Sequence, residues 1–161
     1  MTPHHTLRPA APQDLSAIVG LIRELADFEK LAHLVVVTLE SLRPHLFGPR
    51  PAAEAMVAEV SGTVVAFALF FTNFSTFLGQ PGLYLEDLYV QPAFRGTGIG
   101  KALLQHLGAL ALQRGCGRFE WTVLDWNENA IRFYKQMGAD VMTEWQICRV
   151  TGPALQAFAK A

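Results

Sequence analysis

The sequence predicts one domain of the α/β (α+β) class, in which helices cover both faces of a mixed central β-sheet. Its 161 residues match the size of one domain, since domains average about 150 residues. Apolar residues reach 51% and charged residues only 17%, which excludes a disordered chain. The hydrophobic period changes along the chain in the order β-α-α-β-β-β-α-β-α-β. We therefore expect a single domain over residues 1–161.

The first third of the chain predicts a short strand and two helices. Residues 5–9 can form the strand. From Pro12 to Phe28, apolar residues recur at spacings of three and four, which is typical of a helix with one buried face. Residues 38–46 predict a shorter helix that ends before Gly48.

The middle of the chain predicts a hairpin and a third central strand. Residues 54–60 and 63–74 are rich in Val, Ala and Phe, and Ser61-Gly62 between them is a two-residue turn signal. Residues 79–82 contain Gly and Pro and predict a break. The strand LYLEDLYV is expected to follow over residues 83–90.

The last third predicts two helices that alternate with strands. Residues 99–114 carry an apolar stripe at helical spacing, and residues 119–124 predict the next strand. A helix over residues 127–137 can be capped by its Asn and closed by Gly138. Residues 143–150 predict a last strand, followed by a short C-terminal helix.

Composition argues against several classes of partner. Thirteen basic and fourteen acidic side chains give a net charge of -1, so no general field attracts nucleic acid or an anionic membrane. The longest apolar run, residues 64–71, is too short to span a bilayer. Cys116 and Cys148 have no CxxC partner and are expected to be unpaired thiols in a reducing compartment. The histidines show no metal spacing. We expect a cytoplasmic protein without metal, and the surplus of apolar residues favours a homodimer.

Residues 95–100 carry the most informative motif, RGTGIG, which joins a strand to a helix. Gly96, Gly98 and Gly100 remove the side chains that would keep a ligand from the backbone. The first amides of the following helix lack helical partners, and the helix dipole is positive there. Arg95 adds a charge-assisted donor. These features predict a phosphate or pyrophosphate site, and a tight turn without a ligand is the alternative.

Two common phosphate motifs are excluded here. A P-loop requires GxxxxGK followed by Ser or Thr, whereas Ala102 follows Lys101. A dinucleotide fingerprint requires GxGxxG directly after its strand, whereas the spacing here is GxGxG and residues 91–94 intervene. A nicotinamide cofactor is therefore disfavoured.

The pattern RxxGxG, formed by Arg95, Gly98 and Gly100 after a strand that ends in Val90, resembles the acetyl-CoA signature of the GNAT N-acetyltransferase superfamily. The resemblance continues in NENAIRFYKQMGA over residues 127–139. Together with LYLEDLYV and with LIRELADFEK near the start, these motifs resemble the spermidine/spermine (diamine) and thialysine N-acetyltransferase branch. The resemblance implies the GNAT fold, in which acetyl-CoA binds where two parallel strands splay apart.

The resemblance also implies acetyl-CoA as co-substrate. Ala130 stands where the polyamine enzymes often carry Ser, which removes one hydroxyl contact, but other GNAT members have Ala there. The residues expected at the cofactor are Leu88, Tyr89, Val90, Arg95, Gly96, Thr97, Gly98, Ile99, Gly100, Asn127 and Ala130.

Two catalytic residues are expected from the resemblance. Tyr134 matches the residue that protonates the departing thiolate, which needs a donor as charge develops on sulfur; packing in the core is the alternative. Glu86 and Asp87 interrupt an apolar strand and are expected to point to opposite faces. A carboxylate within a central strand is costly unless it is paired, hydrated or functional. In the polyamine enzymes, the residue that matches Glu86 helps to bind the amine and takes its proton through water. The alternative for Glu86 is a structural ion pair.

The remaining expected substrate contacts would form an anionic pocket. Glu29 matches an acid that contacts substrate in the polyamine enzymes, and Phe28 stands where Tyr is common. Glu144 falls near another such acid. With Glu86 and Asp87 these residues are the predicted substrate-binding set, and solvated surface charge is the alternative for each acid.

The sequence thus predicts transfer of acetyl from acetyl-CoA to a primary amine of a small cationic substrate, such as a diamine, a polyamine or a thialysine-like amino acid. Direct attack is expected, because neither cysteine lies in a nucleophile arrangement. The alternatives are a GNAT enzyme that acetylates a protein amine or an antibiotic amine, and a module that binds acyl-CoA without turnover.

Overall fold

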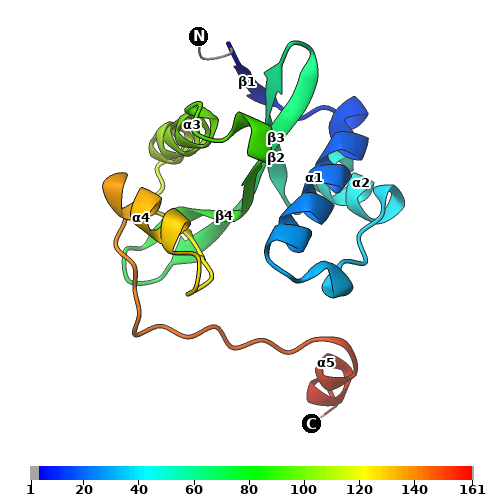
Figure 1. Cartoon of the computed structure of the whole chain (residues 1–161). Coiled ribbons are helices and arrows are strands. Elements are labelled where there is room, and N and C mark those ends of the chain that lie inside the picture. Colours follow the sequence, from blue (N-terminus) through cyan, green and yellow to red (C-terminus); the bar gives the residue numbers. More distant parts are fainter. Residues whose placement is uncertain (1–3, 161) are drawn as a thin grey trace. The chain divides into compact units, whose positions relative to one another are not determined.

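The computed structural model describes residues 4–160 of the chain (Figure 1). The chain forms two compact units, Met1–Thr122 and Val123–Ala161, and each is described by itself. The expectation of a single domain over residues 1–161 stays a prediction.

The first unit is built on a five-stranded sheet whose strands follow one another in chain order. Neighbouring strands are antiparallel except for the last pair, β4 and β5, which is parallel. The strands are β1 (Thr6–Pro9), β2 (Glu54–Val60), β3 (Thr63–Ser75), β4 (Gln80–Val90) and β5 (Arg118–Trp121).

Helices cover both faces of this sheet, as predicted. Helices α1 (Leu15–Phe28) and α2 (Leu39–Phe47) lie on one face, and α3 (Ile99–Gln113) lies on the other (Figure 1). On the α1 face, Leu15, Ile18 and Leu21 pack with Phe67 of β3 and Tyr89 of β4, and all five are buried. Short 3-10 turns precede or follow these helices at Pro12–Asp14, Ala32–Leu34 and Pro92–Phe94.

Local sequence explains the hairpin and the start of α2. Ser61 and Gly62 both have positive φ, 50° and 80°, which is the type I′ geometry that suits a two-residue hairpin. Thr38 Oγ1 accepts a hydrogen bond from the Ser41 amide at 3.2 Å, and Ser41 Oγ accepts one from the Thr38 amide at 2.9 Å. This reciprocal cap fixes where α2 begins.

The predicted start of β4 and both predicted ends of β5 differ from the structure. The break at residues 79–82 is shorter than predicted, because β4 already begins at Gln80. Gly82 lies inside the strand, where a Cβ atom would collide with Asn73 Oδ1. The strand predicted over residues 119–124 begins at Arg118 and ends at Trp121.

The strand predicted over residues 143–150 is also absent. These residues alternate in a way that suits a strand, but a strand forms only where a neighbour supplies hydrogen bonds. Within the part of the chain that the structure describes, no ladder includes them, and all their side chains are exposed.

The second unit holds two short helices, α4 (Glu128–Gln136) and α5 (Gly152–Phe158). The side chain of Asn127 accepts a hydrogen bond from the Ala130 amide at 3.2 Å and so caps α4 as predicted. Gly138 follows the helix with a φ of 92°, a conformation that favours glycine at a helix end.

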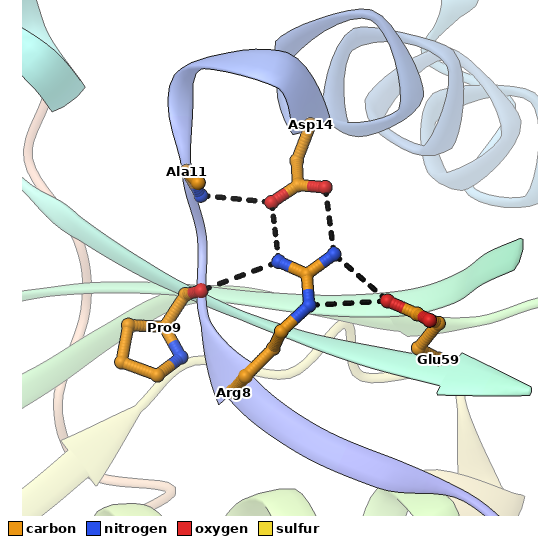
Figure 2. A network of polar contacts seen from close by, with 5 residues as sticks. All are labelled: Arg8, Pro9, Ala11, Asp14 and Glu59. Atoms are coloured by element: carbon orange, nitrogen blue, oxygen red, sulfur yellow. Dashed lines mark hydrogen bonds and ion pairs between the residues drawn. The ribbon is translucent and has the colours of Figure 1, made fainter. Parts of the chain in front are cut away.

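Two half-buried ion pairs of Arg8 tie β1 to the start of α1 and to β2 (Figure 2). The Arg8 guanidinium donates to both carboxylate oxygens of Asp14, at 2.6 and 2.9 Å, and to Oε2 of Glu59 at 2.9 and 3.1 Å. Asp14 is only 5% exposed and also accepts from the Ala11 amide at 2.8 Å. The hydrogen bonds from Arg8 lower the pKa of Asp14. Asp14 therefore anchors the first helix to the sheet.

Among the described residues, no helix combines the length and the apolar character needed to cross a membrane.

Candidate active site

The parallel pairing between β4 and β5 ends halfway along β4. Their pairing runs from Gly82 opposite Arg118 to Leu85 opposite Trp121, and β4 then continues to Val90 while β5 has ended. Over this last part β4 pairs with β3 on one edge only within the described residues. Backbone groups on the other edge can therefore pair with an extended ligand. Leu88, Tyr89 and Val90 lie on this open edge.

A β-bulge lies where this pairing ends. Leu85 pairs with Phe70 and Asp87 pairs with Leu69, so Glu86 is an additional residue on β4. The simple alternation that placed Glu86 and Asp87 on opposite faces does not hold across this bulge. Asp87 shares the face of its partner Leu69, which belongs to the core beneath α1. Glu86 is exposed.

Beside the bulge, Asp87 lies within electrostatic range of two other carboxylates, those of Glu86 and Glu29. Burial, together with the negative charges of Glu86 and Glu29, raises the pKa of Asp87 to about 6. Glu29 directly follows the last residue of α1, and partial burial raises its pKa as well. Like charges that are partly removed from water are stabilised by a bound cation. The arrangement of Glu29, Glu86 and Asp87 therefore suits an ammonium group.

The glycine-rich loop has the backbone geometry of an anion site. Gly96 and Gly98 have positive φ, 75° and 92°, with open space where a Cβ would lie. The first helical bond of α3 runs from the Ala102 amide to the Gly98 carbonyl at 2.9 Å. The amides of residues 99–101 therefore have no acceptor within the helix. Their position suits phosphate oxygens.

The loop is held in this shape by its own contacts. Thr97 Oγ1 donates to the Phe94 carbonyl at 2.6 Å. Gly100 lies close to the end of β4. A Cβ atom added to it would lie 3.7 Å from Val90 Cγ2. The loop and the open edge of β4 are thus adjacent parts of one surface.

Arg95 lies in this loop, and the partners of its side chain are Val90, Phe28 and Tyr89. Its Nε donates to the Val90 carbonyl at 2.9 Å. Its guanidinium carbon lies 4.9 Å from the ring centre of Phe28 and 5.3 Å from that of Tyr89. The ring of Phe28 therefore lies against Arg95, and its predicted contact with substrate stays a prediction.

The other predicted site residues belong to the second unit. Asn127 and Ala130 form the cap of α4. Tyr134 is half-buried on α4, with its ring centre 5.5 Å from that of Phe133. Glu144 is exposed in the unpaired segment that follows.

Sequence reasoning missed two residues near the loop. Gln91 Nε2 donates to Glu24 Oε1 at 3.0 Å, which links the exit of β4 to α1. No motif marks either residue, because the contact depends on how α1 crosses the sheet. In residues 4–160, no group of His, Cys, Asp and Glu side chains could hold a metal ion.

Comparisons with known proteins agree with this geometry. The family model described as "Acetyltransferase (GNAT) family" matches residues 22–139. The mouse (Mus musculus) thialysine N-epsilon-acetyltransferase is 39% identical, with 95% of this chain and 96% of that protein covered. The L-ornithine N5-acetyltransferase NATA1 of Arabidopsis thaliana is 36% identical, with 96% and 87% covered.

A solved structure shows the same fold. An integron cassette protein from the mobile metagenome of V. cholerae superimposes with a TM-score of 0.81 at 26% identity, covering 100% of this chain and 99% of that one. The predicted fold class and the predicted N-acetyltransferase activity are both confirmed. The chain belongs to the GNAT family of acetyltransferases.

Proposed function

We propose that the protein transfers an acetyl group from acetyl-CoA to a primary amine of a small cationic substrate, by direct attack. One observation carries the proposal: the cluster of Glu29, Glu86 and Asp87 begins where β4 loses its β5 neighbour. A thioester laid along the open edge would therefore lie beside these acids, which favour an ammonium group.

The cofactor would use backbone groups more than side chains. The amides of its pantetheine arm would pair with the open edge at Leu88, Tyr89 and Val90, as an added strand does. Its pyrophosphate would accept hydrogen bonds from the loop Gly96, Thr97, Gly98, Ile99 and Gly100 at the start of α3. Asn127 and Ala130 are proposed to approach the cofactor from the second unit.

The acceptor must lose a proton before it reacts. An alkylamine has a pKa of about 10.4 in water, so near neutral pH it is almost wholly protonated. Glu86 is exposed and would take this proton through a water molecule. Glu29 and Asp87, which are less exposed, would hold another cationic group of the substrate, with Glu144 as a further proposed contact.

The chemical step is then a balanced transfer. The neutral amine nitrogen attacks the thioester carbon, while a backbone amide near Leu88 polarises the carbonyl oxygen. The new C–N bond forms and the C–S bond breaks. The departing thiolate would take its proton from the hydroxyl of Tyr134. The second proton of the amine nitrogen, released as the amide forms, would return to the Tyr134 oxygen through water. No acyl-enzyme forms, because the amine attacks the thioester directly and neither cysteine is needed as a nucleophile.

The relatives support the acceptor class. Their names specify thialysine and ornithine, and both compounds carry a side-chain amine in addition to further charged groups.

Thiol release from acetyl-CoA tests the proposal, with putrescine, spermidine, spermine, thialysine, ornithine and a basic peptide as separate acceptors. Turnover with a small amine, but not with the peptide, is expected. Turnover with the peptide alone would favour a protein acceptor, and acetyl-CoA binding without any turnover would favour a sensor.

A further inference from the structure

Two side chains reach across β4 where its pairing with β5 begins. Asn73 of β3 is opposite Gly82 of β4, and Gly82 is opposite Arg118 of β5. From β3, Asn73 Nδ2 donates to Oε1 of Glu120 on β5 at 2.8 Å. From β5, the Arg118 guanidinium donates to the Phe74 carbonyl of β3 at 3.2 Å. Side chains therefore join β3 to β5 directly, in addition to the backbone ladders that join each of them to β4.

Glycine at position 82 leaves the room that these contacts need. A Cβ atom there would collide with Asn73 Oδ1 and would lie 3.0 Å from Arg118 Cγ. Arg118 and Glu120 also form an ion pair, with 3.2 Å between Nε and Oε1. Asn73, Gly82, Arg118 and Glu120 thus form one unit, which we call the cross-strand clamp.

The orientation of the Asn73 amide has a cost. Its nitrogen faces Glu120, so its oxygen lies toward Gly82. Oδ1 is buried and has no hydrogen-bond partner among the described residues. A buried acceptor without a donor lowers the stability of the folded state. Stability alone is therefore an incomplete explanation of the clamp.

The clamp can form in only one register of β5. Side chains alternate between the two faces of a strand, so a slip of β5 by one residue would turn Glu120 away from Asn73. A slip by two residues would put Arg118 or Thr122 in the place of Glu120, and neither has a carboxylate. This selection matters because β5 is only four residues long and lies at the edge of the sheet.

The register of β5 determines where the open edge of β4 begins. In the observed register the ladder ends with Leu85 opposite Trp121, and residues 86–90 of β4 have no β5 neighbour. A β5 strand that slipped toward the glycine-rich loop would cover part of this edge. A β5 strand that frayed would leave the start of the edge undefined.

We propose that Asn73, Arg118 and Glu120 are positioning residues for acetyl-CoA: they hold β5 in the register that leaves residues 86–90 of β4 free to pair with the cofactor. This inference rests on the proposed function, in which the cofactor lies along that edge. The clamp lies at the start of the ladder, and the cofactor would lie beyond its end. The three residues therefore act through β5 and not by contact.

Two single variants and their combination test the clamp. Asn73→Leu and Glu120→Leu each remove one side of the same hydrogen bond and keep a side chain of similar size. Both positions are half-buried, so both variants are expected to fold. Glu120→Gln keeps an oxygen that can accept from Asn73 and serves as the conservative rescue.

Met56→Ala is the matched control for a loss of stability. Met56 is buried in β2, which pairs with β1 and β3 but not with β4 or β5. Truncating a buried methionine destabilises the fold without touching the clamp. Each variant is compared with wild type well below its unfolding temperature, by calorimetry for the Kd of acetyl-CoA and by hydrogen exchange for residues 118–121.

The two leucine variants should each weaken acetyl-CoA binding about threefold or more, because only molecules with β5 in register bind the cofactor. Exchange in residues 118–121 should be about tenfold faster, since a charge-assisted contact that opposes opening is lost. The double variant should be no worse than Glu120→Leu, because both substitutions remove the same contact. Glu120→Gln should lie close to wild type. Met56→Ala should unfold more easily but bind acetyl-CoA like wild type.

Two results would overturn the inference while leaving the proposed function in place. The first is an acetyl-CoA Kd that Asn73→Leu and Glu120→Leu leave unchanged. The second is an equal weakening in Met56→Ala, which would trace the effect to lost stability. A wild-type protein that binds acetyl-CoA but releases no thiol with any amine would refute the proposed function instead, and the Kd values would still test the clamp. A wild-type protein that binds no acetyl-CoA would refute both.

Discussion

Leu85 of β4 and Trp121 of β5 form the last pair in the parallel ladder between the two strands. Beyond this pair β4 carries the bulged Glu86, the half-buried Asp87 and the open edge that leads to the glycine-rich loop. The end of one short strand therefore places an acid cluster, a backbone edge and an anion site next to one another.

Gly98 is expected to be essential for cofactor binding. Its φ of 92° is a conformation that L-residues rarely adopt. Gly98→Ala should therefore distort the loop and weaken acetyl-CoA binding by about tenfold or more, since such strain costs roughly 1–3 kcal/mol. Calorimetry measures this. Gly108→Ala, in the interior of α3 with nothing near the added Cβ, should leave the Kd unchanged; equal effects of both variants would contradict the assignment.

Asp87 is expected to reduce stability at neutral pH. Its pKa is about 6 in the folded chain, above its ordinary value of 3.8, so the folded state binds its proton more tightly than the unfolded state. The free energy of unfolding therefore falls as pH rises from about 4 through about 6.

The variant Asp87→Asn should remove this loss. At pH 8 its free energy of unfolding should exceed that of wild type by roughly 1–3 kcal/mol, the scale of a two-unit pKa difference. Below pH 4 the two should agree. Urea unfolding at pH 3.5 and pH 8 makes the comparison, and Glu86→Gln, at an exposed position, should show a smaller effect. A less stable Asp87→Asn at pH 8 would refute the account.

Asp14 is expected to be the most costly acid to remove. Asp14→Ala leaves the Arg8 guanidinium without its main partner and should lower the free energy of unfolding by about 2–4 kcal/mol. Because Arg8 lowers the pKa of Asp14, this stabilisation is present above the ordinary Asp pKa and is lost as pH falls through the depressed value. Glu54→Ala, which breaks the exposed pair with Arg114, should cost less than about 1 kcal/mol. Similar losses from the two variants would show that the Arg8–Asp14 contacts contribute no more than an exposed ion pair.

Tyr134→Phe separates an enzyme from a sensor. If the hydroxyl protonates the leaving thiolate, kcat should fall by about a hundredfold, the lower range for general acid catalysis. The Kd of acetyl-CoA should stay within twofold of wild type, because only one oxygen is removed. Stopped-flow thiol release and calorimetry give the two values. An unchanged kcat would leave Tyr134 with a packing role.

Local signals predicted most elements of this fold but not the details of the site. The turn at Ser61-Gly62 and the cap at Asn127 depend on neighbouring residues, so the sequence contains them. The bulge at Glu86 depends on the register between β3 and β4, which no local pattern encodes.

Long-range contacts explain the remaining differences. The contact of Arg95 with Phe28 depends on how α1 crosses the sheet, and the role of Arg95 at the cofactor stays a prediction. The grouping of Glu29 with Asp87 followed from family resemblance and not from spacing. Residues 143–150 have the pattern of a strand, but a pattern cannot provide the partner that a strand needs.

Acceptor selectivity at the acid cluster tests the central claim most directly. Thiol release from acetyl-CoA is measured at pH 8 with putrescine and with butylamine, which has the same carbon chain but a single amine, for wild type and Asp87→Asn. The account predicts that wild type prefers putrescine by at least about tenfold in kcat/KM, since a second charge-assisted contact contributes roughly 1.5–3 kcal/mol. This preference should largely disappear in Asp87→Asn. Equal use of both amines by wild type, or a preference that survives the substitution, would contradict it.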